Sequence, residues 1–207
     1  MYIINKHSKN DRFAKLAAMG EQVFHIDDLA NIWGITNKHT LRVTLSRYVK
    51  AGMLKRIYRG LYAIKDLSEI DPRLIGVKAI HGPAYISCET ILFDHGLINQ
   101  FPMSISIISG SSKTFSIGGQ DYRSMKLDPK YLFNDAGIKI ENGVRTASPE
   151  RALADAYYYN PWKYVDGVDK YDFNLIDWKK YDEVIRAVGY TSQIKKRQIK
   201  KHVHHPK

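Results

Sequence analysis

The chain has 207 residues, of which 44% are hydrophobic and 26% are charged, and its formal net charge is +11. This length and composition suit one or two soluble domains, and no apolar run approaches the roughly 20 residues that a membrane helix needs. A single cysteine, Cys88, excludes an internal disulfide framework and a four-thiolate metal site. The polar start of the chain predicts no signal peptide, so we expect a cytoplasmic protein.

The positive charge is concentrated at the two ends of the sequence. Residues 1–66 hold 12 basic and 5 acidic residues (+7), residues 67–194 hold 14 and 16 (−2), and residues 195–207 hold 6 and 0 (+6), which add to +11. This asymmetry favours a polyanion-binding module attached to a domain with another task, over a generally basic surface. For the basic tail, residues 195–207, a solvated chain end is the favoured interpretation, and an extended phosphate contact is the alternative.

The first 66 residues predict a small domain that begins with two helices. An amphipathic helix is predicted over Lys9–Met19, followed by a short apolar link at Val23–His25. A second helix is predicted over Leu29–Trp33, with Asp27 or Asp28 as its N-cap.

The third helix, which is capped by Thr36 or Asn37, has two contrasting faces. At 100° per residue its apolar side chains fall within about a quarter-turn, so we expect them to pack on the first two helices. These side chains are Leu41, Leu45, Tyr48 and Val49. The stretch from Thr36 to Gly60 contains seven Lys and Arg residues and no acid. Two short segments joined by the basic turn Tyr58–Gly60 follow and form a small basic hairpin. A helix with one apolar and one basic face, followed by such a hairpin, predicts a winged helix-turn-helix domain over residues 1–66.

In helix-turn-helix docking, the N-terminal part of the third helix enters the major groove of DNA. Arg42 and Arg47 suit bidentate contact with guanine, whereas Asn37 suits adenine and Val43 suits a thymine methyl group. The remaining basic side chains suit phosphate contacts, with Arg59 at the tip of the wing. The alternative is that these are solvated helix positions. The predicted DNA-binding residues are Asn37, Lys38, His39, Thr40, Arg42, Val43, Ser46, Arg47, Lys50, Lys55, Arg56 and Arg59.

Residues 67–207 predict a second domain, after a linker at Asp66–Arg73. From Met103 the hydrophobic period changes to two, and turns at Gly118-Gly119 and Glu141–Gly143 predict an antiparallel sheet of about four or five strands. The expected fold class is therefore α+β: a winged helix-turn-helix, then a mixed α/β domain with an antiparallel sheet and a helical C-terminus. The predicted helices are Leu74–Ile80, Cys88–His95 with Ser87 as its cap, Arg151–Tyr159 opened by Ser148-Pro149-Glu150, Leu175–Val188, and a last one after Thr191.

A search for catalytic motifs finds no glycine-rich phosphate loop, no HExxH pair and no GxSxG elbow. Cys88 lies near the start of a predicted helix, where a thiolate is stabilised, but inert packing is the better interpretation. We interpret His202, His204 and His205 as adventitious metal ligands, and the aspartates of residues 166–172 as a solvated loop. We therefore expect no catalytic residue, no cofactor and no metal site.

Three segments carry motifs that occur together in one known family. They are TLRVTLSRYVKAGMLKRIYRGLYAI, which has the pattern of a winged helix-turn-helix, GPAYISCETILFDHGLI with its Tyr-Ile-Ser … Leu … His-Gly-Leu pattern, and TASPERALADAYYY with its Ala-Ser-Pro-Glu-x-Ala-Leu … Asp pattern. In order and spacing they resemble the AbiEi-type antitoxins of bacterial type IV toxin–antitoxin systems, over about residues 10–190. Departures are Thr90-Ile91, where small residues are common in the family, Arg151, where the family has Lys, and the unmatched aspartate-rich loop. The matching residues of the second domain are Tyr85, Ser87, His95, Gly96, Leu97, Pro149, Glu150 and Asp155.

The resemblance implies a protein with two functions. The first domain would bind inverted repeats of double-stranded DNA at its own promoter and repress the operon. The second would counteract a nucleotidyltransferase-like toxin encoded beside it, with or without a direct complex; no membrane partner is expected. One alternative is a winged-helix regulator whose second domain senses a ligand. Another is an enzyme, for example a nuclease, with a DNA-binding domain, although no suitably spaced carboxylate cluster favours it.

Overall fold

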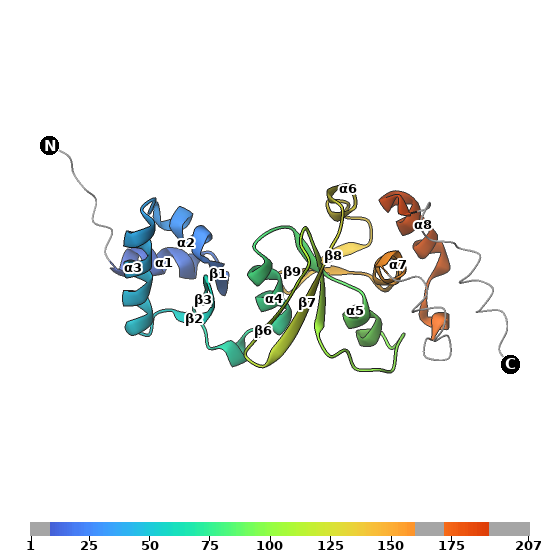
Figure 1. Cartoon of the computed structure of the whole chain (residues 1–207), viewed down its shortest axis with the longest axis horizontal. Coiled ribbons are helices and arrows are strands. Elements are labelled where there is room, and N and C mark those ends of the chain that lie inside the picture. The colour runs from blue at the N-terminus through green and yellow to red at the C-terminus, as the bar shows by residue number, and fades with distance from the viewer. Residues whose placement is uncertain (1–8, 160–171, 191–207) are drawn as a thin grey trace. The chain divides into compact units, whose positions relative to one another are not determined.

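The computed structural model describes residues 9–159 and 172–190, which belong to two compact units, Met1–His81 and Gly82–Lys207 (Figure 1). The first unit ends at His81 and not at residue 66, because helix α4 (Pro72–Ile80) packs on strand β1 (Val23–His25). Pro72, which we expected in a linker, is the first residue of α4, where its missing N–H costs no hydrogen bond. None of the described helices is both long and apolar enough to cross a membrane.

The first unit combines helices with a three-stranded sheet in the order β1-β3-β2. Both strand pairs are antiparallel, and the segment that we expected as an apolar link is β1, which places Val23 opposite Ala63 and His25 opposite Leu61. The other elements are α1 (Lys9–Ala18), α2 (Ile26–Trp33), α3 (Lys38–Lys50), β2 (Lys55–Tyr58), β3 (Leu61–Ala63) and the 3-10 helix η1 (Leu67–Glu69).

The apolar stripe of α3 packs as predicted. Leu41, Leu45 and Tyr48 are buried, and the Tyr48 ring stacks on Trp33 with ring centroids 5.1 Å apart. Each such side chain contributes about 1.5–3 kcal/mol on burial, so the stripe fixes which face of α3 points outward. The core cluster of this unit consists of Leu16, Phe24, Leu29, Trp33, Ile35, Leu41, Leu45, Tyr48, Leu54 and Tyr62.

The N-caps of α2 and α3 agree only in part with the predictions. Asn37 caps α3, because its Oδ1 accepts two backbone N–H groups of the first turn at 2.9 and 3.0 Å. Helix α2 is capped by His25 and not by Asp27 or Asp28. The His25 Nδ1 accepts the N–H of Asp27 at 3.3 Å, while Asp28 Oδ2 accepts the N–H of His25 at 3.1 Å. The acids were misassigned because α2 begins earlier than its apolar period shows.

The second unit contains a six-stranded sheet in the order β6-β7-β5-β4-β9-β8. The antiparallel prediction is correct only in part, because β4 with β9 and β5 with β7 are parallel pairs. Turn signals specify the two hairpins, whereas parallel pairs join strands through long crossovers that leave no local signal. The strands are β4 (Ala84–Ile86), β5 (Ile105–Ser109), β6 (Lys113–Ile117), β7 (Gln120–Lys126), β8 (Ile138–Glu141) and β9 (Val144–Ala147).

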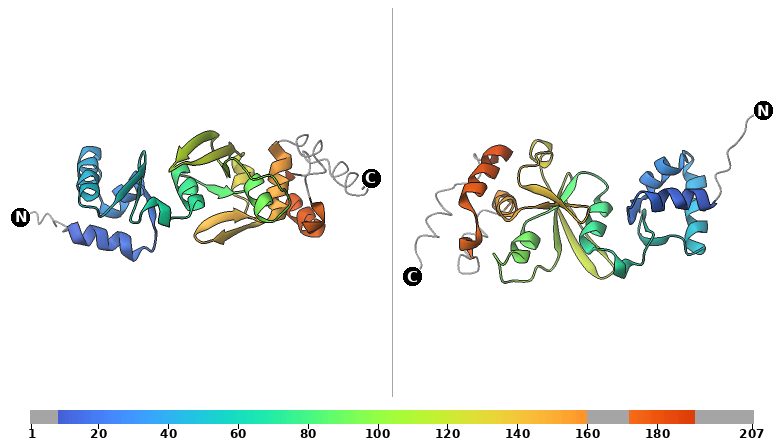
Figure 2. Two further views of the ribbon diagram at one scale, coloured as in Figure 1. Left: turned by 90° about the horizontal axis from the view of Figure 1, so that it is seen from below. Right: turned by 180° about the vertical axis from the view of Figure 1, so that it is seen from behind.

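Helices α5 and α7 contact each other and the sheet, and α8 packs across α7 (Figure 2). Ser148 caps α7 as predicted, with its Oγ accepting the N–H of Arg151 at 3.2 Å. Ser87 does not cap α5; Cys88 holds that position, and the Ser87 hydroxyl donates to Asp155 instead. The helices are α5 (Glu89–Asp94), α6 (Pro129–Leu132), α7 (Pro149–Tyr159), η3 (Phe173–Leu175) and α8 (Trp178–Val188). The predicted final helix, the tail 195–207 and the loop aspartates up to residue 171 lie outside the described residues.

Candidate nucleic-acid interface

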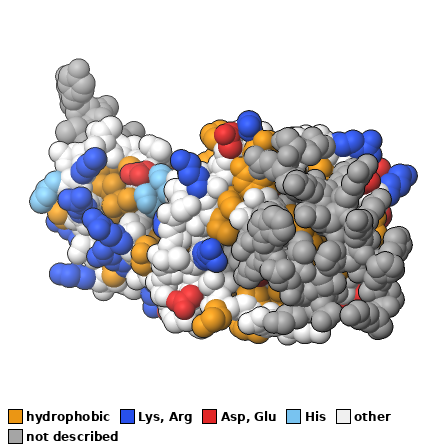
Figure 3. Space-filling model, turned by 45° about the vertical axis from the view of Figure 1, so that its right-hand side comes forward, with side chains coloured by type: hydrophobic (Ala, Val, Ile, Leu, Met, Phe, Trp, Pro, Cys, Tyr) orange, Lys and Arg blue, Asp and Glu red, His pale blue; other side chains and the backbone are white. Residues whose placement is uncertain are grey.

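The outward face of α3 carries most of the predicted DNA-binding residues. Packing of the apolar stripe leaves the opposite side of the helix in solvent, and Lys and Arg side chains gather on this part of the surface (Figure 3). Val43 is the exception, because it is half-buried beside the stripe. The exposed residues are Asn37, Lys38, His39, Thr40, Arg42, Ser46, Arg47 and Lys50.

Asn37 has a structural task that limits its predicted contact with adenine. Its Oδ1 accepts the backbone N–H groups of His39 and Thr40. A bidentate contact with adenine needs both the amide oxygen and the amide nitrogen. While the cap is intact only the nitrogen of Asn37 is available, so the cap must open before the predicted contact can form.

The hairpin β2–β3 adds three exposed cations, Lys55, Arg56 and Arg59. Strand β3 is buried along its whole length and anchors the hairpin, and Gly60, with φ +74°, forms the turn next to Arg59. The Lys55 Nζ lies 3.1 Å from Asp66 Oδ1, and both side chains are exposed. Such a surface pair contributes at most about 1 kcal/mol, so a phosphate can replace the carboxylate.

Three of the residues that the sequence analysis selected in the second unit, Tyr85, Ser87 and Asp155, meet at the buried carboxylate of Asp155. Asp155 is fully buried and accepts four hydrogen bonds. Its Oδ2 accepts from Tyr85 at 3.0 Å and from Ser87 at 2.7 Å. Its Oδ1 accepts from Arg151 Nε at 3.0 Å and from Tyr190 at 2.7 Å. We call these five side chains the Asp155 cluster.

Every N–H group of the Arg151 guanidinium donates a hydrogen bond, some within the cluster and some to the backbone. Besides Asp155, its guanidinium donates to the Tyr85 hydroxyl at 2.8 Å and to backbone carbonyls of Tyr131, Asn134 and Ala136. Burial alone would lower the pKa of Arg151, but the electrostatic interactions with Asp155, Tyr85 and Tyr190 together outweigh burial and raise it. Burial, followed by the Asp155 charge, raises the pKa of Tyr85 and of Tyr190. Every polar group is satisfied, so the cluster holds α7 to β4 and to the 131–136 segment and has no group left for chemistry.

The other motif residues mostly serve packing and chain direction. Leu97 is buried, Gly96 has φ +71°, Pro149 begins α7, and Glu150 is buried in its first turn. His95 is the exposed exception. Cys88 is buried, and burial, followed by Asp155 and Glu89, raises the pKa of its thiol well above the usual value. A thiol kept protonated in this way is a poor nucleophile, which agrees with inert packing.

The sequence analysis missed the roles of Arg151 and Tyr190. Arg151 and Asp155 are four residues apart on α7, a spacing at which oppositely charged side chains pair, and this was the available signal. The same spacing is common on exposed helices, so it does not reveal burial. Tyr190 follows the Gly189 cap of α8 and carries no local signal.

No protein-family model matches the chain, and no curated protein matches it either. Among solved structures, the chain is similar to the RV2827C protein from Mycobacterium tuberculosis, with a TM-score of 0.47 and 12% sequence identity. The match covers 94% of this chain and 80% of that chain. At this level of similarity we infer neither fold nor function from it.

Proposed function

We propose that the first unit is a winged helix-turn-helix that binds double-stranded DNA, with α3 in the major groove and the β2–β3 hairpin as the wing. The observation that carries the proposal is the basic surface from Thr36 to Gly60, where seven Lys and Arg side chains are all exposed and no acid occurs. Cations arranged in this way neutralise phosphates and release counterions. Arg42 and Arg47 then contact base edges, and Arg59 contacts a phosphate beside the groove.

The resemblance to AbiEi-type antitoxins extends this proposal to the whole chain. We propose that the protein represses its own operon by binding inverted repeats in the promoter, and that it is the antitoxin of a type IV system. The second unit would counteract a nucleotidyltransferase-like toxin encoded by the neighbouring gene. The structure contributes one constraint, which is that the Asp155 cluster is internal and cannot itself contact a toxin in the folded protein.

Binding of the upstream DNA, measured by fluorescence anisotropy at several salt concentrations, tests the first part. Arg47→Ala should lose about 1–3 kcal/mol of discrimination at one base pair, because a bidentate contact is removed. Arg59→Ala should weaken binding to all sequences and reduce the salt slope by about one, because one phosphate contact is removed. Arg186→Ala, which removes an exposed arginine from α8 of the second unit, is the matched control and should bind like wild type.

A double variant, Arg47→Ala with Arg59→Ala, that binds the operator with wild-type affinity and salt slope would show that the recognition surface is elsewhere. The second part needs a growth assay in which the chain is expressed with the neighbouring gene product from separate inducible promoters. The same double variant should still relieve toxicity, since antagonism is assigned to the second unit. If wild type does not restore growth, the antitoxin proposal fails and the alternative of a ligand-sensing regulator takes its place.

A further inference from the structure

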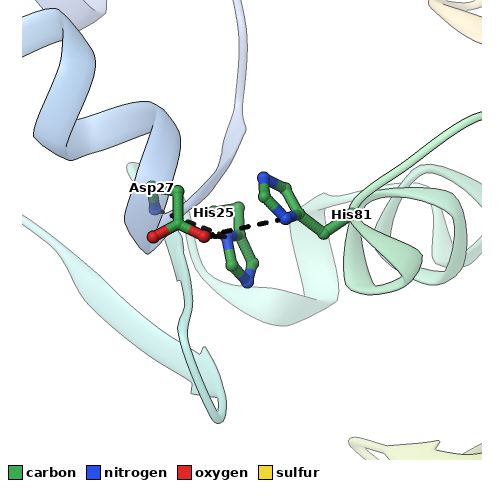
Figure 4. A group of neighbouring side chains, drawn as sticks. All are labelled: His25, Asp27 and His81. Carbon is green, nitrogen blue, oxygen red and sulfur yellow. Dashed lines mark hydrogen bonds and ion pairs between the residues drawn. The ribbon is translucent and has the colours of Figure 1, made fainter.

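Three side chains of the first unit, His25, Asp27 and His81, converge beside the end of α4 (Figure 4). One nitrogen or oxygen atom from each lies within 4.8 Å of the others. The Nδ1 atoms of His25 and His81 are 3.3 and 3.8 Å from the same oxygen, Asp27 Oδ2. Within residues 9–159 and 172–190, no other three His, Cys, Asp or Glu side chains are this close.

The backbone, and not long side chains, brings these residues together. His25 ends β1, Asp27 lies in the first turn of α2, and His81 is the C-cap of α4. Because α4 packs on β1, the two imidazole rings stack, with centroids 3.6 Å apart and an angle of 18° between the ring planes. His81 has φ 51°, a left-handed conformation that glycine or asparagine adopts with less strain.

Two imidazoles and one carboxylate are a donor set that suits zinc and similar divalent transition metals. With bonds of about 2.0–2.2 Å, tetrahedral ligand atoms lie about 3.4 Å apart, so the present separations must shrink by at most about 1.4 Å. The side chains of Asp27 and His81 are 64% and 40% exposed, so both can move, whereas His25 is only 19% exposed. The Nδ1 of His25 accepts the backbone N–H of Asp27 as the N-cap of α2, so this cap bond must open before Nδ1 can bind an ion. The stacked His81 ring has to turn for its lone pair to point at the ion.

A second carboxylate, that of Asp28, lies near the other ring nitrogen of His81. Asp28 Oδ1 lies 3.8 Å from His81 Nε2, the ring nitrogen that does not face Asp27. In protein metal sites the nitrogen of a histidine that does not bind the metal commonly donates to a carboxylate, which fixes the tautomer and the ring orientation. Asp28 can take this part for His81 while Asp27 provides the ligand.

We propose that His25, Asp27 and His81 bind a divalent transition-metal ion, with Asp28 orienting His81. Three protein ligands leave one tetrahedral position for water, as in exchangeable or reactive zinc sites. A bound ion ties the end of α4 to the corner between β1 and α2. This site does not depend on DNA binding, and it lies outside the residues that the sequence analysis considered for metals.

The probe is Zn²⁺, titrated by calorimetry into the full chain in which His202, His204 and His205 have been replaced by Ala. Removing these tail histidines prevents adventitious binding from being counted. We expect one Zn²⁺ per chain. Adding His81→Asn should weaken the affinity at least about tenfold, because a ligand is lost, and loss of a residue that only hydrogen-bonds to a ligand already weakens metal binding about 10–100-fold. His95→Asn removes another exposed histidine, from the second unit, and should leave the affinity unchanged.

Asparagine tolerates the left-handed backbone of residue 81, so the His81→Asn variant is expected to fold. If circular dichroism shows that it does not, Asp27→Asn takes its place with the same expected loss. A thermal scan gives a second measurement, since Zn²⁺ should raise the melting temperature of the tail-substituted chain but not that of the site variants. Absence of binding in the tail-substituted chain, or binding that both site variants retain, would overturn the proposal.

Discussion

The Asp155 cluster gives a sharp prediction about what holds the second unit together. In Asp155→Asn the side chain keeps its shape, but one of its oxygens becomes an NH₂ group that faces donors. The Tyr85 and Ser87 hydroxyls donate to one oxygen, and Arg151 and Tyr190 donate to the other. Either orientation of the amide removes the acceptor of two donors, and the orientation toward Arg151 also sets the NH₂ group against a guanidinium, which cannot accept. In addition, the buried Arg151 cation loses its counter-charge.

The expected cost is about 3–5 kcal/mol, the usual effect of removing one partner from a buried ion pair. Since a folded domain is stable by about 5–15 kcal/mol, this is a large share of the total. Hydrogen exchange read by mass spectrometry is the appropriate assay, because it reports each unit separately. At 1.4 kcal/mol per factor of ten, amides of β4 and α7 should exchange about 10² to 10³·⁵ times faster than in wild type.

The first unit serves as an internal control, and peptides from α3 should exchange at the wild-type rate. Glu183→Gln, an isosteric change at an exposed acid on α8, should shift exchange by no more than about 0.5 kcal/mol. Less than a tenfold acceleration in Asp155→Asn would mean that the Arg151 charge is compensated in some other way, and our account of the cluster would be wrong.

Two further predictions concern the same unit. A Cβ at Gly137, where φ is +73°, would lie 2.8 Å from Arg151 Cβ, so Gly137→Ala should lower the free energy of unfolding by about 2–4 kcal/mol in urea denaturation. Gly143→Ala, at φ +79° with open space around it, should cost only about 1–2 kcal/mol, and an equal cost at both sites would contradict the clash. Burial and the Asp155 charge raise the pKa of Tyr190, so the folded protein keeps a proton that the unfolded chain releases near pH 10. The free energy of unfolding should therefore fall above about pH 10, by about 1.4 kcal/mol per pH unit for this phenol, and Tyr190→Phe should show a shallower fall in urea titrations.

Local features of the fold were predictable because their signals lie within a few residues. The stripe of α3 follows the 3.6-residue period, and Leu41, Leu45 and Tyr48 are buried as expected. The turn at Gly118-Gly119 joins β6 to β7, and Ser148 caps α7. In each case neighbouring side chains determine the backbone conformation directly.

Long-range features were not predictable in this way. Strand β1 was read as a link because three residues are too few to show a period, and only pairing with β3 makes them a strand. The parallel pair between β4 and β9 joins Ile86 to Thr146, which no local rule connects. Arg151 is buried because carbonyls from the 131–136 segment and the carboxylate of Asp155 surround it, and a helix sequence cannot report what its neighbours supply.

Whether a residue is buried by long-range packing or exposed decides how loss-of-function data on the second unit should be interpreted. Tyr85, Ser87 and Asp155 are the polar motif residues that a mutational scan would select first, yet all three are buried in one satisfied network. A change in any of them removes function by unfolding the unit, whichever surface carries the function. His95 belongs to the same motif but is exposed, and its side chain is outside the Asp155 cluster. A substitution at His95 that removed the proposed toxin antagonism and left hydrogen exchange unchanged would therefore locate a contact surface, which no substitution within the cluster can do.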